Sequence, residues 1–345
     1  MRIILDAMGG DNAPMAPVMG ALAAAKDFGA QITLVGRGEE ILQVLRQQNI
    51  DTLPEGVEIA NAEEVVDMHD DPANVIRKKK NSSMVIGLKL LADGEGDAFV
   101  SAGSTGALLS GDTLLVKRVK GIRRAAMGPV MPNKAGGKTV ILDCGANAEC
   151  TPEFLLQFGL VGSLYAKKYL GVENPKVGLL NIGTEDSKGT QLQKDAYALL
   201  TKASEQGLVN FVGNVEARGV PLGEVDVVVC DGFNGNVLIK TIEGTAMFFG
   251  SLMKNKIFKR NTLSKIGYLF CKKGVDDVMK MMDSREIGGT QFLGIKLPVI
   301  KCHGNSDRLA FRNGISQAIQ AAEGNFADEL EAALAELKKI EGDAE

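Results

Sequence analysis

The chain has 345 residues, enough for one large α/β domain or two smaller ones. Its net charge of −4, the absence of tryptophan and an aromatic fraction of 5% argue against a nucleic-acid-binding surface. The five cysteines form no C-x-x-C pair, which is typical of a reduced, cytoplasmic protein without a disulfide framework or a zinc site. No apolar run approaches the roughly 18 residues that a transmembrane helix needs.

Short, mostly β-branched apolar segments recur along the chain, and most end in a glycine-rich loop. They predict strands at residues 3–5, 32–35, 98–100, 140–142, 177–181, 210–212, 225–229 and 299–301. Helical patterns lie between them, at residues 16–29, 39–48, 83–94 and 152–171. Repeated strand–helix alternation predicts an α/β fold with a doubly wound, mostly parallel sheet in a three-layer, Rossmann-like arrangement. We expect a single catalytic domain over residues 1–335 and a frayed tail over residues 336–345.

One segment departs from this alternation. Between Thr245 and Val275 there is no acidic residue and there are seven basic ones, interleaved with aromatic and aliphatic side chains at helical spacing. We interpret residues 246–282 as a basic, amphipathic helical insertion made of two short helices. A helix pair rich in lysine and phenylalanine suits the surface of an anionic bilayer.

The loops after the predicted strands are the place to look for a site, because open parallel sheets bind ligands at the carboxyl ends of their strands. The loop SAGSTGA, residues 101–107, is the best candidate for binding an anion. Gly103 and Gly106 allow the main chain to approach a ligand closely. Ser104 and Thr105 offer hydroxyls at the start of a helix. The same loop would also serve as an ordinary helix cap.

The first loop, DAMGGDNAP at residues 6–14, places two acids around two glycines. Gly9 and Gly10 would bend this loop back over the pocket. Asp6 and Asp11 would then orient hydrogen-bond donors rather than bind an anion, since like charges repel. Asp11 also suits a helix N-cap.

Three further loops carry candidate groups. NIGTEDSKG (181–189) contains a lysine that would be a mobile positive charge or simply a solvated loop residue. DGFNGN (231–236) precedes a helix, and its asparagines would either bind substrate or hold left-handed turns. HGNS (303–306) contains one of only two histidines. The expected catalytic residues are Lys188, Asn236 and His303. The expected substrate-binding residues are Asp6, Gly9, Gly10, Asp11, Gly103, Ser104, Thr105, Gly106, Asn147, Glu185, Asp231, Asn234 and Lys240.

Several chemistries are disfavoured by single residues. Ile41 stands where a dinucleotide-binding G-x-G-x-x-G motif needs its third glycine, and Pro132 stands where a P-loop needs its first. Ala102 replaces the first glycine of a G-x-S-x-G nucleophile elbow. We therefore expect no cofactor and no metal.

In this order, the loops resemble those of the bacterial phosphate acyltransferase family of phospholipid synthesis. The resemblance runs from Met1 to about Ala333, and its motifs are DAMGGDNAP, SAGSTGALL, ILDCGANAECTPEFLLQF, NIGTEDSKG, GEVDVVVCDGFNGNVLIKTIEG and HGNS. The sequence departs from the family pattern at Ser104, where an asparagine is usual, at Ile287 in place of tyrosine, and at Thr290-Gln291 in place of Ala-Pro.

The resemblance implies transfer of a fatty acyl group from acyl carrier protein to inorganic phosphate. It also implies a homodimer, and an acyl phosphate product that a membrane acyltransferase uses next. Phosphate would be the nucleophile and the thioester the electrophile, so the protein must align them and stabilise an oxyanion. His303 or Lys188 would protonate the leaving sulfur. A less favoured alternative is an acyl-enzyme on Cys144 or Cys230, because buried cysteines usually serve packing.

The same resemblance leaves three partners for the insertion: a membrane, the acidic carrier protein, or a second subunit. The candidate contact residues are Phe249, Lys256, Lys259, Arg260, Lys265 and Phe270. We expect a cytoplasmic protein associated peripherally with the inner face of the plasma membrane. The rival functions are a short-chain phosphate acyltransferase using coenzyme A thioesters, a metal-dependent hydroxyacid dehydrogenase on the same fold, and a non-catalytic membrane-surface scaffold.

Overall fold

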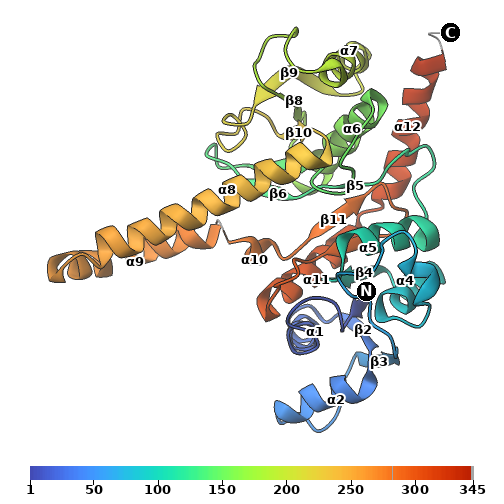
Figure 1. The fold of residues 1–345 in the computed structure, drawn as a ribbon, viewed down its shortest axis with the longest axis vertical. Coiled ribbons are helices and arrows are strands. Elements are labelled where there is room, and N and C mark those ends of the chain that lie inside the picture. Colours follow the sequence, from blue (N-terminus) through green and yellow to red (C-terminus); the bar gives the residue numbers. More distant parts are fainter. Residues whose placement is uncertain (282, 343–345) are drawn as a thin grey trace.

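The computed structural model describes residues 1–281 and 283–342, which form an α/β body with a long helical arm projecting from it (Figure 1). The strands are divided between two sheets. The first has the order β3-β2-β1-β4-β12-β11-β5, and the second has the order β6-β7-β10-β8-β9. Most neighbouring strands are parallel, and the antiparallel pairs are β11–β12, β11–β5 and β6–β7.

The first sheet contains the strands β1 (Arg2–Asp6), β2 (Gln31–Gly36), β3 (Val57–Asn61), β4 (Ala98–Ser101), β5 (Ala126–Met127), β11 (Thr290–Leu293) and β12 (Val299–Lys301). The second contains β6 (Val130–Pro132), β7 (Lys138–Leu142), β8 (Lys176–Asn181), β9 (Asn210–Glu216) and β10 (Val227–Val229). The helices around the first sheet are α1 (Met15–Phe28), α2 (Gly38–Gln47), α3 (Val75–Lys78), α4 (Ser83–Ala92), α5 (Thr105–Gly111) with its π-helical extension η1 (Asp112–Val116), α10 (Ser284–Ile287) and α11 (Arg308–Glu323). Those around the second are α6 (Pro152–Tyr169), α7 (Gln191–Glu205), α8 (Gly232–Leu252) and α12 (Phe326–Gly342).

Helices cover both faces of the central strands, because successive strand residues point to opposite sides. In β1, Ile3 and Leu5 pack with residues of α1 and α11, whereas Ile4 packs with residues of α4 and α5. In β10, Val227 and Val229 face α6 and α7, and Val228 faces α8. This two-sided burial explains why the strands read as continuous apolar runs rather than alternating ones.

The α/β class and the mostly parallel strands predicted from sequence are confirmed, but the strands form two sheets where one was expected. The missed strands are β3, β5, β6 and β11. The chain passes from the first sheet to the second between β5 and β6, which are two and three residues long, too short for a periodicity to reveal. The closing helix α12 extends to Gly342, beyond residue 336 where a frayed tail was predicted to begin.

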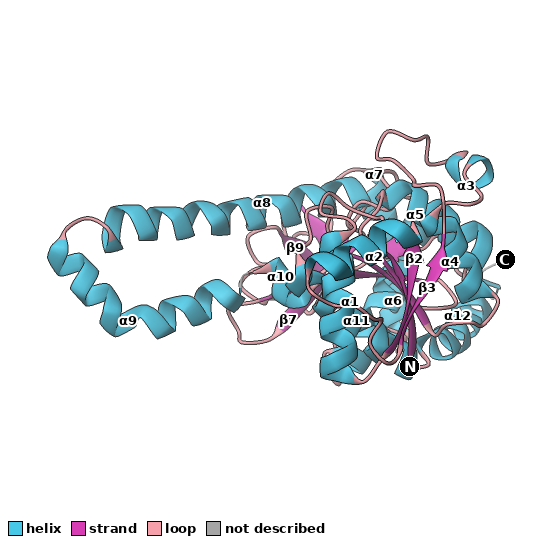
Figure 2. Ribbon diagram, turned by 90° about the horizontal axis from the view of Figure 1, so that it is seen from below, coloured by secondary structure: helices cyan, strands magenta, loops and turns pink. Residues whose placement is uncertain are grey.

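The predicted insertion is helical, but its helices are longer than expected. Helix α8 leaves the second sheet and continues through a π-helical segment η2 (Met253–Phe258), and α9 (Thr262–Met281) runs back along it (Figure 2). Neither η2 nor α9 contains a buried residue. Within the described part of the chain, no helix is both long and apolar enough to cross a bilayer.

Candidate active site

Three loops meet at the carboxyl ends of β1, β4 and β12, where the strand order of the first sheet reverses. Gly9 and Gly103 lie so close that a Cβ on Gly9 would be 2.8 Å from the Gly103 nitrogen. Gly10 adopts a φ of +95°, and the Asp11 N–H donates to the Gly304 carbonyl at 2.7 Å. Gly9 and Gly10 of DAMGGDNAP and Gly103 of SAGSTGA are therefore needed for the loops to approach so closely.

Asp6 holds two of these loops together. The Ser101 hydroxyl donates to Asp6 Oδ2 at 2.7 Å, and the Gly103 N–H donates to Ser101 Oγ at 3.0 Å. Burial raises the pKa of Asp6, while hydrogen bonds, among them those from Ser101 and the Met8 N–H, oppose this shift. Asp11 is exposed and does not cap a helix: α1 begins after Pro14, without a side-chain cap, so the predicted N-cap at Asp11 is wrong.

The SAGSTGA loop presents its polar groups at the start of α5. Ser104 is the N-cap residue by position, is 7% exposed, and makes no side-chain cap. The helix-cap role considered for this hydroxyl is thus not realised. Thr105 is half-buried on the first turn, and a Cβ on Gly106 would lie 3.0 Å from Pro72.

Lys301 is the residue of this region that the sequence analysis missed. It is the last residue of β12, and its ammonium donates to the main-chain oxygens of Ala102, at 3.5 Å, and Cys302. In the part of the chain that the structure describes, no carboxylate lies within ion-pair distance of this ammonium. Burial lowers the pKa of Lys301, whereas the charges of Asp11 and Asp6 act in the opposite direction. A partly desolvated cation therefore lies beside the glycine loops.

The second sheet contributes the first turns of α8. Asp231 is the N-cap of this helix: it accepts a hydrogen bond from the Asn234 N–H at 2.8 Å and from Asn234 Nδ2 at 2.6 Å. Asn147 Nδ2 donates to the buried Asp143 at 2.9 Å and to the Ala125 carbonyl at 2.8 Å. These three predicted binding residues, Asp231, Asn234 and Asn147, are thus engaged in holding the loop and helix.

Asn236 and Lys240 are four residues apart on α8 and share one face of the helix with Glu243. Lys240 Nζ lies 2.7 Å from Glu243 Oε2. Lys240 and Glu243 line a cavity of about 730 Å³ opposite His303, together with Ser306, whose buried hydroxyl finds no hydrogen-bond partner among the described residues. The cavity therefore lies between helices α8 and α9 on one side and the β12–α11 loop on the other.

His303 is exposed at the wall of this cavity. Partial desolvation and the nearby cations of Lys240 and Lys301 lower the pKa of His303, and Glu243 partly opposes the shift. The imidazole is therefore neutral over more of the pH range than a solvated histidine.

Lys188 and Glu185 lie apart from this cluster. Lys188 Nζ is 4.0 Å from Glu185 Oε1 of the same loop, and both side chains are largely exposed. Among the described residues that line the two cavities at His303, neither of them appears. The solvated-lysine interpretation fits this position better than the catalytic one.

Two cysteines considered as nucleophiles are buried. Cys144 is 1% exposed and Cys230 is 4% exposed, and burial raises the pKa of both thiols well above the usual value. The thiolate is the nucleophilic form, so these environments oppose an acyl-enzyme.

The fold is similar to that of solved phosphotransacetylases. A solved phosphotransacetylase from Streptococcus pyogenes superposes with a TM-score of 0.59 at 20% identity, covering 94% of each chain. The family model described as fatty acid synthesis protein matches residues 1–329. The phosphate acyltransferase of Alkaliphilus oremlandii is 47% identical, covering 93% of each chain, and that of Desulfitobacterium hafniense strain DCB-2 is 46% identical, covering 96% of each. The chain belongs to the phosphate acyltransferase family of lipid synthesis, and the predictions of an enzyme, an acyltransferase and this family are confirmed.

Proposed function

We propose that this protein transfers the acyl group of an acyl carrier protein thioester to inorganic phosphate, producing an acyl phosphate for phospholipid synthesis. The observation that carries the proposal is Lys301, a cation without a carboxylate partner among the described residues, placed where three glycine-rich loops meet. Such a site suits a small, doubly charged anion, because main-chain N–H groups and an ammonium satisfy its oxygens together.

Phosphate would be held by Lys301, the loop amides and the hydroxyls of Ser104 and Thr105. The thioester carbonyl would enter from the His303 cavity, facing Lys240; Asn236 does not line this cavity among the described residues and lies about one helical turn earlier on the same face of α8. Neutral His303 would accept the one proton of monohydrogen phosphate, HPO4²⁻, as a phosphate oxygen attacks the carbonyl carbon. When the C–S bond breaks, the same imidazole would return this proton to the leaving sulfur. His303 is favoured over Lys188 for this step, because His303 lines the cavity.

The test mixes the purified protein with acyl–acyl carrier protein and inorganic phosphate, and traps acyl phosphate with hydroxylamine. Phosphate-dependent acyl hydroxamate and free carrier are the expected products. Product only from acyl-coenzyme A would indicate the short-chain class, reduction of a nicotinamide cofactor by a hydroxyacid would indicate the dehydrogenase, and no product from any donor would favour the scaffold.

We propose that the body, residues 1–335, is one catalytic domain and that the arm, residues 246–282, is its membrane contact. The arm exposes large apolar side chains among its lysines: Phe249 is 57% exposed and Phe270 is 88% exposed. Its other candidate contacts are Lys256, Lys259, Arg260 and Lys265. Such a surface fits the anionic inner face of the plasma membrane, with the enzyme cytoplasmic and its product delivered to a membrane acyltransferase.

Flotation with vesicles of anionic or neutral phospholipid tests this contact. We expect salt-sensitive binding to anionic vesicles that Phe270→Ser weakens. Failure to bind, with retention on immobilised acyl carrier protein or a dimer that dissociates on the same substitution, would assign the arm to the carrier or to a homodimer interface instead.

A further inference from the structure

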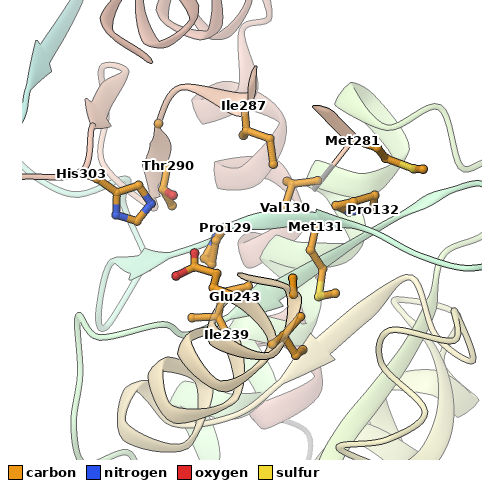
Figure 3. Close-up of a pocket in the computed structure, with 13 residues that line it drawn as sticks. Pro129, Val130, Met131, Pro132, Ile239, Glu243, Met281, Ile287, Thr290 and His303 are labelled. Carbon is orange, nitrogen blue, oxygen red and sulfur yellow. The ribbon is translucent and has the colours of Figure 1, made fainter. Parts of the chain in front are cut away.

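Two further cavities continue from the one that contains His303. The first, of about 80 Å³, is called the neck here and is shown in Figure 3. It shares Glu243, Ala246 and His303 with the cavity described above. The second, of about 560 Å³, is called the far cavity and shares Val130, Pro132, Met281 and Ile287 with the neck. The far cavity also shares Lys280 and Glu286 with the cavity that contains His303, so the three spaces are neighbours, and the neck borders both of the others.

The neck changes character along its length. At one end His303, Thr290 and Glu243 present nitrogen and oxygen atoms, and at the other end Val130, Met131, Pro132 and Met281 present carbon and sulfur (Figure 3). The polar end is the one that reaches the proposed reaction site. A ligand that fits this gradient has a polar head at His303 and an unbranched apolar tail.

Four separate elements supply the apolar wall: β6, α8, α10 and, through Met281, α9. Val130 and Pro132 are two residues apart on β6 and so lie on one face of that strand. Ile239, Ile242 and Ala246 follow each other at helical spacing on α8, next to the face that carries Lys240. Ile287 closes the opposite side from the end of α10.

We propose that the neck holds the acyl chain of the substrate next to the reacting carbonyl at His303. The chain then extends past Ile287 along the apolar residues of the far cavity, among them Tyr165 and Leu170, and away from its charged wall of Lys138, Asp277, Lys280 and Glu286. This inference rests on the proposed function, since it places the tail of the same substrate. Unbranched methionine side chains adapt to chains of different shape, and Met131 and Met281 lie where the tail would pass. Ile287 is then a specificity-determining residue, because it borders both the neck and the far cavity.

Substitutions at Ile287 test this placement in opposite directions. Each methylene that enters an apolar site contributes a factor of about 4 to binding, so excluding two of them changes selectivity by roughly 15-fold. We expect Ile287→Phe to lower the ratio of kcat/KM for palmitoyl over octanoyl donors by about that factor. Ile287→Ala, which widens the passage, should raise the ratio. A loss of folded protein cancels in this ratio, because both donors are assayed on the same sample.

Val212→Phe is the matched control, since Val212 lies half-exposed on the edge strand β9 and lines none of these cavities among the described residues. It should leave the ratio unchanged. A ratio that is equally unaffected by Ile287→Phe, or equally affected by Val212→Phe, would overturn the placement of the chain.

A binding measurement separates this proposal from the proposed function. Palmitic acid carrying a terminal diazirine is photolysed with the unmodified protein, and the labelled peptides are identified. Label within residues 129–132, 138 or 165–170 supports the channel even if no acyl phosphate is formed from any donor. Label confined to the arm around Phe270, with full acyl transfer, would overturn the channel and leave the proposed function standing.

Discussion

Replacing Lys301 by methionine removes the ammonium from the loop junction and keeps an unbranched side chain of similar length. The ammonium contacts two main-chain oxygens and no carboxylate among the described residues, so one charged group is lost without leaving a buried acid unpaired. A hydrogen bond between charged groups contributes about 1.5 to 3 kcal/mol. The expected effect is therefore a roughly 10- to 150-fold rise in the KM for phosphate, with a smaller change in the KM for the acyl donor.

Although Lys301→Met should weaken phosphate binding, it should not lower the free energy of unfolding. Burial lowers the pKa of Lys301, so the unfolded chain holds this proton more tightly than the folded protein does. The free energy of unfolding therefore rises with pH between the folded pKa and the usual lysine value. Lys301→Met removes this penalty, so its melting temperature without phosphate should equal or exceed that of the parent. Its advantage should shrink as the pH rises through that range.

The assay measures initial rates of acyl hydroxamate formation against phosphate concentration, alongside thermal unfolding with and without phosphate. Phosphate should raise the melting temperature of the parent and much less that of the variant. Lys296→Met removes an exposed lysine from the β11–β12 connection and is the control for net charge. A folded Lys301→Met protein whose phosphate KM stays within about twofold of the parent would refute the assignment of Lys301 to phosphate.

Three further predictions follow from the surroundings of single residues. The pKa of His303 is lowered, so kcat/KM should fall when the pH drops through a pKa below the usual histidine value. His303→Gln should remove this acidic decline from the pH profile and lower the rate by about 10²- to 10⁴-fold. Asp112 is fully buried, and neither of its carboxylate oxygens has a hydrogen-bond partner among the described residues. Burial raises the pKa of Asp112, so this carboxyl group lowers the free energy of unfolding as the pH rises. Asp112→Asn should therefore raise the urea midpoint at neutral pH, by about 1 kcal/mol or more in unfolding free energy, and a lowered midpoint would contradict this. A Cβ on Gly235 would lie 1.9 Å from the Asp143 carbonyl oxygen, whereas one on Gly244 meets nothing within 4 Å. In the same urea titration, Gly235→Ala should lower the free energy of unfolding by about 1 to 3 kcal/mol, and Gly244→Ala should raise it by about 0.5 to 1 kcal/mol.

Most of the central strands follow from local sequence. Apolar runs such as Ile3–Leu5 and Val140–Leu142 are long enough for their composition to indicate a strand buried on both faces. The division into two sheets did not follow, because β5 and β6 are only two and three residues long and β5 pairs with β11, more than 160 residues later in the chain. Strand pairing at that separation is a tertiary contact, and no local pattern carries it.

The candidate site also has parts that local sequence predicts and parts that it does not. The glycine loops were predicted from their composition, because only glycine permits the approach of Gly9 to Gly103 or the φ of Gly10. Lys301 was passed over because a lysine at the end of a strand resembles any solvated lysine in sequence. Lys188, which stands in a glycine loop, was preferred and lies outside the cavity that contains His303.

By itself, the sequence determined the class of fold, the family and the loops that carry the chemistry. Each of these depends on short segments whose backbone conformation is set by neighbouring residues. Only the tertiary structure decided which charged groups share one space. It brings Lys240 from α8, His303 from the loop after β12 and Ile287 from α10 together around neighbouring cavities, with Lys301 near enough to lower the pKa of His303. Burial and electrostatic coupling are properties of that shared space, so they exist only when the two sheets and the arm are packed together.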